Sequence, residues 1–202
     1  MTLSRHDAAQ VAALLRHPDG ERAGRLRLWE AWDEGAGGSP ALEFVEESHG
    51  IARNWDGMHV LLTGCVNHTD EDHEVPCGPV PARDVVLGGL PLMSKGQDDL
   101  EDSALRLGNA RLLLPAEVRA AERFLRSFAA RDTDIAARIR ERAALIEAAD
   151  VYSFRMLVGS PDGRATRMSM IEDGSLAESL RVVRDFYARA AAAGNAVVKE
   201  IS

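Results

Sequence analysis

The chain has 202 residues, of which 24 are Lys or Arg and 32 are Asp or Glu, giving a net charge of −8. A chain of this length can bury a core without disulfides or metal ions. Basic residues alternate with acidic ones along the sequence, which excludes the clustered Lys and Arg needed to bind nucleic acid or an anionic membrane surface. We therefore expect no nucleic-acid partner and no membrane partner.

The N-terminus lacks an apolar stretch long enough for a signal peptide, and no segment reaches the roughly 20 apolar residues that span a bilayer. The two cysteines are too few for a disulfide framework and fit a reducing compartment. We therefore expect a cytoplasmic protein.

The first part of the chain carries two helix signals. Ser4 followed by Asp7 is typical of an N-cap with an acidic residue three positions later, and the turn at 17–20 predicts the end of that helix. A second short helix precedes the glycine-rich stretch at 35–40, which is the best candidate for a hinge. We interpret residues 1–40 as an N-terminal helical part of the fold.

The next predicted helix runs from Ile51 to Gly64. Ile51, Trp55, Met58 and Leu62 are spaced i, i+4, i+7 and i+11, which predicts an apolar stripe on one face of an amphipathic helix. Gly64 is well placed as the residue that ends the helix.

The later elements have clear boundary signals. Short apolar runs bounded by Gly, Pro or Asn predict strands, and a Pro or a capping residue ahead of an apolar stripe predicts a helix. In chain order we expect strands at 85–87 and 111–114, helices from Pro115 and over 134–149, a hairpin about the turn at 159–163, a helix from Ser175 to Gly194, and a strand at 196–201. The fold class is α+β, a single domain over 1–202 in which several amphipathic helices pack with a small, mostly antiparallel sheet.

A Cys/His cluster lies between Cys65 and Pro81, in a polar segment that we interpret as an exposed loop. Cys65, His68, His73 and Cys77 are the residue types that bind tetrahedral zinc, although their spacing matches no standard zinc finger. The alternative is an ordinary solvated loop without a metal. A disulfide between the two cysteines is the least expected outcome in a reducing compartment.

Trp55 and His59 are neighbours on one face of the 51–64 helix. One interpretation is a pocket wall, with the indole as a platform, the imidazole as a donor or acid–base group, and Tyr152 as a further lining residue. The alternative is a core tryptophan with a hydrogen-bonded histidine at its edge. No catalytic motif accompanies the pair, so the sequence leaves enzymatic activity open.

Several segments together resemble the YfbM-like family of bacterial domains of unknown function (domain of unknown function 1877). The 88–92 segment Gly-Gly-Leu-Pro-Leu resembles the family's Gly-Gly-x-Pro segment, and two departures are Ala52 in place of a helix aspartate and Leu114 in place of a threonine cap. The resemblance implies an α+β cytoplasmic fold without an assigned activity. The most specific matching residues are Trp55, Gly57, His59, Leu61, Leu62, Thr63 and Gly64.

From these features we predict a ligand- or protein-binding module without an established catalytic activity. The ligand-binding residues would be Trp55, His59 and Tyr152, and an acidic protein of this kind would also suit a role in neutralising a toxin. The alternatives are a hydrolase or transferase that uses His59, with the Cys/His loop as a zinc site, and a purely structural or oligomer-forming domain.

Overall fold

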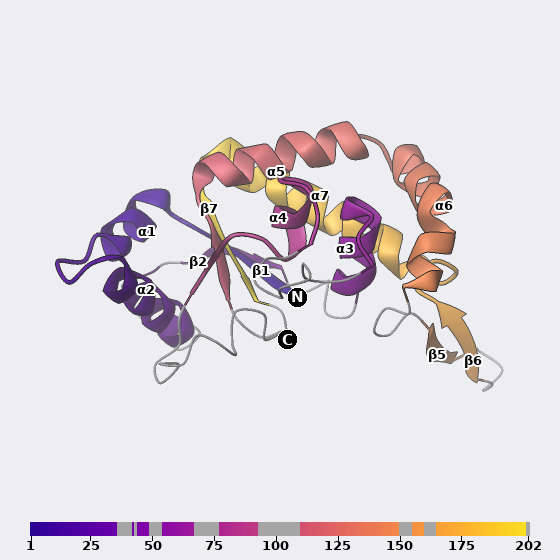
Figure 1. The fold of residues 1–202 in the computed structure, drawn as a ribbon, viewed down its shortest axis with the longest axis horizontal. Helices are drawn as coiled ribbons and strands as arrows, with labels where there is room; N and C mark the ends of the chain where they lie inside the picture. The colour runs from indigo at the N-terminus through magenta and orange to yellow at the C-terminus, as the bar shows by residue number, and fades with distance from the viewer. Residues whose placement is uncertain are drawn as a thin grey trace.

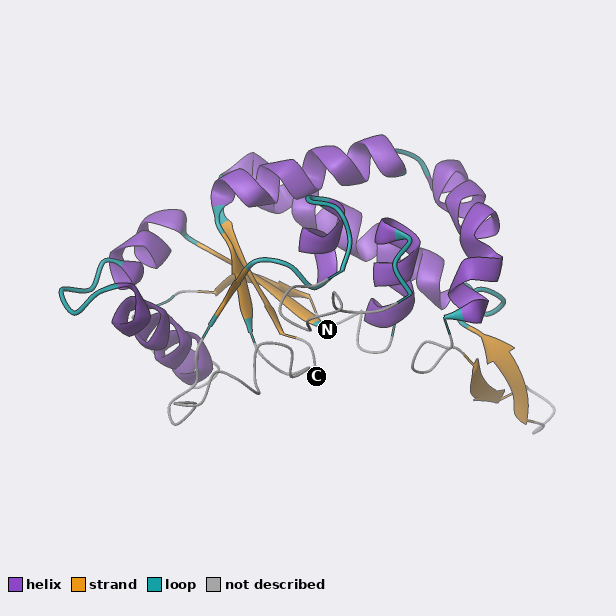
Figure 2. Ribbon diagram, in the orientation of Figure 1, coloured by secondary structure: helices purple, strands orange, loops and turns teal. Residues whose placement is uncertain are grey.

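The structure is a computed structural model that describes residues 1–35, 42, 44–48, 54–66, 77–92, 110–149, 155–159 and 165–200. Helices and strands are interspersed along these ranges (Figures 1 and 2). In chain order they are β1 Thr2–His6, α1 Ala8–Leu15, α2 Glu21–Gly35, β2 Phe44–Ser48, α3 Trp55–Thr63, α4 Ala82–Val86, β3 Leu90–Pro91, β4 Arg111–Leu113, α5 Pro115–Phe128, α6 Asp132–Ala148, β5 Arg155–Gly159, β6 Ala165–Ser169, α7 Ser175–Ala193 and β7 Ala196–Glu200.

The main sheet has five strands in the order β2-β1-β7-β4-β3, and every neighbouring pair is antiparallel. The central strand β7 pairs with β1 on one side and with β4 on the other, so both ends of the chain contribute to the middle of the sheet. Strands β5 and β6 form a separate antiparallel hairpin, which lies beyond α6 and α7 (Figure 1). This arrangement confirms the predicted α+β class with a small antiparallel sheet.

Helices cover both faces of the sheet, and each face has its own core. Because side chains alternate along a strand, Ala196 and Val198 of β7 pack with α1 and α2, whereas Val197 packs with the helices on the opposite face. Figure 1 shows α1 and α2 on one side of the sheet and α3 to α7 on the other. The next residue on the second face is Lys199, a cation directed into a core.

Most of the predicted elements in the second half of the chain are confirmed. Helix α5 begins at Pro115 and α6 buries its isoleucines, while α7 ends at Gly194, which has a left-handed backbone (φ 68). The strand before α5, the β5–β6 hairpin and the last strand also occur where the sequence predicts them. In this region, long periodic stripes of apolar residues, bounded by Pro or Gly, were therefore sufficient to predict the helices.

The prediction of a helix starting at Ser4 is wrong. Ser4 lies in the middle of β1, and the helix begins after Asp7, whose carboxylate accepts the N–H groups of Ala9 (3.0 Å) and Gln10 (2.9 Å). The capping signal was real but belonged to Asp7, because pairing with β2 and β7 makes the preceding residues extended. The N-terminal part is therefore not purely helical, since it supplies a strand next to the centre of the sheet.

The predicted strand at 85–87 is also wrong, because Val85 and Val86 belong to the short helix α4. Both side chains are fully buried, as are Ala82 and most of Asp84. A helix that is covered on most sides shows a continuous apolar run instead of a stripe, and such a run is also typical of a buried strand.

Candidate functional site

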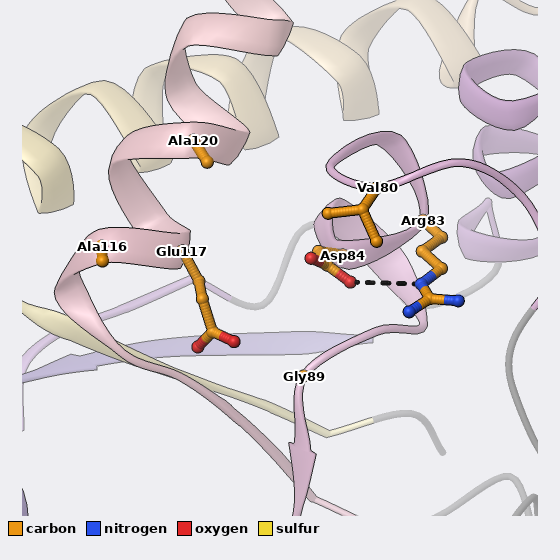
Figure 3. A pocket seen from close by; sticks show the side chains of 7 residues that line it. All are labelled: Val80, Arg83, Asp84, Gly89, Ala116, Glu117 and Ala120. Atoms are coloured by element: carbon orange, nitrogen blue, oxygen red, sulfur yellow. Dashed lines mark ion pairs between the residues drawn. The ribbon is translucent and has the colours of Figure 1, made fainter.

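A cavity of about 470 Å³ lies between α4 and the first turns of α5. Arg83 and Asp84 of α4 line one side and Glu117 of α5 lines the other, with Gly89 below them (Figure 3). The remaining lining residues are small and apolar: Val80, Ala116 and Ala120. The cavity thus combines three charged groups with an apolar wall, and its volume is in the range of small-molecule sites.

Helix α4 is too short to satisfy its own carbonyl groups, and two buried side chains from other elements do so. The Lys199 ammonium donates to the carbonyl oxygens of Asp84 and Gly88, the latter at 2.7 Å. The Tyr187 hydroxyl of α7 donates to the carbonyl oxygen of Val85 at 3.1 Å. Since unpaired carbonyls at a buried helix end are costly, these bonds hold α4 at its position beside the cavity.

Lys199 is fully buried, and this environment changes its acidity. Burial lowers the pKa of Lys199 from its usual 10.5 to about 7, while the nearby Asp84 carboxylate opposes that shift. The Arg111 guanidinium, directly opposite on β4, lowers the pKa further, and the Glu117 carboxylate raises it. The two carboxylates of the cavity are therefore close enough to Lys199 to favour its charged form.

Asp84 is 8% exposed, and its carboxylate faces the cavity (Figure 3). Among the described residues, its side-chain partner is the adjacent Arg83, with Nε 3.6 Å from Oδ1. Gly88 passes so close that an added Cβ would overlap Asp84 Oδ1. A glycine at position 88 is thus required to leave room for this carboxylate.

Glu117 has a structural role as well as a position on the cavity. One of its carboxylate oxygens accepts the backbone N–H of Leu114 at 2.7 Å, which closes the first turn of α5. This bond explains how α5 begins without the threonine cap expected from the family resemblance, because Leu114 itself makes no side-chain cap bond. The second carboxylate oxygen leaves Glu117 able to bind a ligand.

The chemistry of this cavity favours binding of a cationic group. Two carboxylates from different helices face the same space, and charge-assisted hydrogen bonds to carboxylates are strong where water is partly excluded. In the described part of the chain, no group of three or more His, Cys, Asp or Glu side chains could hold a metal ion. An organic ammonium or guanidinium group needs only the two carboxylates and an apolar wall.

The predicted site residues on α3 lie elsewhere, in the core. Trp55 is 4% exposed and His59 is fully buried, and neither lines the α4–α5 cavity. The prediction of an amphipathic α3 is wrong, because every residue from Trp55 to Leu62 is buried. Gly57, part of the motif shared with the family, contacts Met170 so closely that a Cβ would overlap its sulfur. Tyr152, the third predicted lining residue, lies outside the described residues.

The expectation against a disulfide is wrong, because Cys65 and Cys77 are bonded. The end of α3 and the segment leading into α4 pack together, which brings the two Cα atoms to 6.1 Å, a distance suited to a disulfide. A bonded cysteine cannot act as a thiolate ligand, so zinc binding would require reduction first. The other two predicted ligands, His68 and His73, fall in a range that the structure does not describe.

A second cavity of about 350 Å³ lies between the end of α5 and α6. Its charged lining residues, Asp134, Arg138 and Glu141, are engaged with neighbours on the helix surface: Arg138 donates to Glu141 at 2.9 Å, and Asp134 accepts from Arg131 at 2.9 Å. Both of these pairs are solvent-exposed, and exposed ion pairs contribute little to stability, so substitutions here are suitable controls for those at the α4–α5 cavity.

Sequence reasoning missed the α4–α5 cavity for a specific reason. Asp84 precedes an apolar run that suggested a strand, and the partner carboxylate comes from 33 positions later in the chain. One sequence feature could have indicated a polar site near the core. Lys199 lies within the predicted strand 196–201, directly after the apolar residues Ala196, Val197 and Val198. Val198 and Lys199 point to opposite faces of the strand. Since helices cover both faces of this sheet, Lys199 must enter a core.

Comparisons with known proteins give the family of the chain. Among solved structures, the chain is similar to a protein of unknown function, YfbM from Escherichia coli, with 17% identity and a TM-score of 0.47 over 98% of this chain and 96% of that chain. A search of curated proteins gives no match. No described helix is long and apolar enough to cross a membrane. A family model described as "Domain of unknown function (DUF1877)" matches residues 1–199, and the chain therefore belongs to the DUF1877 family.

Proposed function

We propose that this chain is a binding module that takes a small organic cation into the α4–α5 cavity. The observation that carries the proposal is the pair of carboxylates, Asp84 and Glu117, on opposite walls of one cavity (Figure 3). An ammonium or guanidinium group between them would make charge-assisted hydrogen bonds to both. Val80, Ala116 and Ala120 would contact the aliphatic part of the same ligand.

The buried network behind the cavity supports binding rather than catalysis. The Lys199 and Tyr187 donors are committed to backbone carbonyls of α4, so they position the wall that carries Asp84. Neither described cavity is lined by a histidine, cysteine or serine–histidine pair that could act as a nucleophile with its base. The alternative of a hydrolase or transferase that uses His59 stays a prediction from the sequence.

The proposal is tested by a binding screen in which the ligands differ in charge but have similar lengths. Thermal shift and calorimetry would compare linear diamines and guanidino amines with neutral diols of the same length and with carboxylates. We expect the cations to bind and the diols and carboxylates to fail. Binding of the carboxylates alone would contradict the proposal, because Asp84 and Glu117 would repel them.

Two variants locate the binding site. Asp84→Asn removes the charge on the α4 wall, and Glu117→Gln removes the charge on α5 while keeping an acceptor for the Leu114 N–H. We expect each variant to weaken binding by about 10-fold. Glu141→Gln, a carboxylate of the second cavity, is the matched control and leaves the affinity unchanged.

A further inference from the structure

The segment that leads into α4 is attached to the end of α3 by the Cys65–Cys77 disulfide. The two residues are 12 positions apart, and they are the only cysteines of the chain. Both are partly exposed to solvent. A small thiol in solution could therefore reach the bond without unfolding of the protein.

The α3 side of this attachment is firmly held. Arg142 of α6 donates to the carbonyl oxygen of Leu61 at 2.8 Å. The Thr63 hydroxyl donates to the carbonyl oxygen of His59 at 2.7 Å and accepts the N–H of Cys65 at 3.0 Å. The end of α3, held by these hydrogen bonds, is therefore a fixed anchor for the disulfide.

The other side of the attachment forms the entrance to α4. Gly78 packs against Thr63, since an added Cβ would lie 2.7 Å from the Thr63 Cβ. The carbonyl oxygen of Pro79 accepts the N–H of Arg83 at 3.1 Å, and that of Pro81 accepts the N–H of Asp84 at 3.1 Å. The residue between these two prolines, Val80, lines the cavity. The disulfide thus holds the residues that fix the first turn of α4.

The far end of α4 does not depend on the disulfide. Lys199 donates to the carbonyls of Asp84 and Gly88, and Tyr187 donates to that of Val85. A chain of this length buries enough surface to fold without a covalent link. Loss of the disulfide would therefore loosen the first turn of α4 and leave the rest of the fold in place.

From this geometry we propose that Cys65–Cys77 is a thiol–disulfide exchange site whose redox state controls the α4 wall of the cavity. The co-reactant is a small-molecule thiol of the glutathione class. Its thiolate attacks one sulfur, the other sulfur leaves as a thiolate and takes up a proton, and a second thiol releases the mixed disulfide. The protein gains two thiols, and two small thiols become one disulfide, so the exchange is balanced and reversible.

Residue-resolved amide exchange tests the proposal without any ligand. The protein would be studied by NMR in its oxidised form and after equilibration with reduced glutathione, with thiol titration confirming two free thiols. We expect the exchange rates of the Arg83 and Asp84 amides to rise by about 10-fold on reduction, while that of Leu125 in α5 stays within about 2-fold. Unchanged rates at Arg83 and Asp84, or global unfolding on reduction, would overturn it.

The double variant Cys65→Ser/Cys77→Ser is the matched control. It lacks both thiols, so it should show the exchange pattern of the reduced protein with or without glutathione. A variant that shows the oxidised pattern would contradict the proposal, because the attachment would then have no effect on α4.

The effect on ligand binding rests on the proposed function. We expect reduction to weaken binding of a diamine by about 5-fold or more, because Val80 and Arg83, which line the cavity at the entrance to α4, lose their fixed positions. If no cation binds in either redox state, the proposed function fails and the amide exchange still decides the present proposal. If the diamine binds equally well in both states, control of the cavity by the disulfide is overturned.

Discussion

Helices α3 and α4 are neighbours, both are buried, and both carry polar residues, but their surroundings differ. Two polar side chains of α3, those of Asp56 and His59, lie within the core. On α4, Arg83 and Asp84 face a cavity whose opposite wall supplies another carboxylate. A polar residue in a buried helix therefore indicates a ligand site only where a second element leaves space in front of it.

The two helices are also held differently. Helix α3 is buried from Trp55 to Leu62, and near its end Arg142 donates to the carbonyl oxygen of Leu61. Helix α4 depends on a buried ammonium and a buried hydroxyl for its carbonyls. Substitutions on α3 should therefore reduce stability through lost packing. Substitutions around α4 should instead remove hydrogen bonds to its carbonyls, change how stability depends on pH, and weaken binding of a cation in the cavity.

The largest expected effect is on the α3 side of this comparison. Trp55→Ala removes a large side chain from a closely packed core, and we expect a loss of about 3–5 kcal/mol in the free energy of unfolding. Urea-induced unfolding followed by circular dichroism measures the change. A loss below about 1 kcal/mol would show that Trp55 lies at a surface or pocket, as the sequence interpretation suggested.

The next effect concerns the support of α4. Lys199→Met leaves the carbonyls of Asp84 and Gly88 without a donor, and we expect it to cost about 2–4 kcal/mol at pH 9. Tyr187→Phe removes a single donor, from the Val85 carbonyl, and should cost about 1 kcal/mol. Equal costs for the two variants would contradict the role assigned to Lys199.

The Lys199 contribution also has a defined pH dependence. Since burial lowers the pKa of Lys199 to about 7, the unfolded chain binds the proton more tightly than the folded one, and stability rises as the pH increases from 7 toward 10. Relative to Lys199→Met, the wild-type protein should gain about 1 kcal/mol per pH unit in this window. Burial raises the pKa of Tyr187, which opposes the trend above pH 10. A flat difference between the two proteins from pH 7 to 9 would contradict a buried, titrating Lys199.

A smaller effect on stability is expected from a substitution at Gly88, which lies against the Asp84 carboxylate of the cavity. Gly88→Ala would place a Cβ against Asp84 Oδ1 and 2.8 Å from the Asp84 Cα, so both the carboxylate and the backbone at Asp84 must move to make room. We expect a stability cost of about 1–2 kcal/mol together with a loss of cation binding. The same change at Gly20, where nothing lies within 4 Å of an added Cβ but φ is +97, is a control that costs stability and leaves binding unchanged. Retained binding in Gly88→Ala would show that the position of Asp84 is not important.

The sequence was sufficient for elements whose signals are local. The stripes of α5 and α7, with Pro115 and Gly194 at their ends, depend on neighbouring residues and were predicted correctly. The strand β1 and the helix α4 were not, because their conformations are fixed by partners far along the chain: β7 for Ser4, and Lys199 for the carbonyls of α4.

The candidate site was less accessible to sequence reasoning than the fold. Trp55 and His59 attracted attention because they share a helix face, yet burial depends on what packs around that helix, and α3 packs against α4, α6 and α7. Asp84 and Glu117 come from two helices that meet only in the folded chain, and no motif connects them. The redox-sensitive pair was visible in the sequence, but its proximity depended on the packing of α3 with α4.

Whether the α4–α5 cavity binds cations is decided by the dissociation constant of one linear diamine, measured by calorimetry for the wild-type protein, Asp84→Asn and His59→Gln at the same salt concentration. If the α4–α5 cavity is the binding site, Asp84→Asn weakens binding by about 10-fold and His59→Gln leaves it unchanged within about 2-fold. A loss of affinity in His59→Gln with full affinity in Asp84→Asn would contradict the account and place the site on α3.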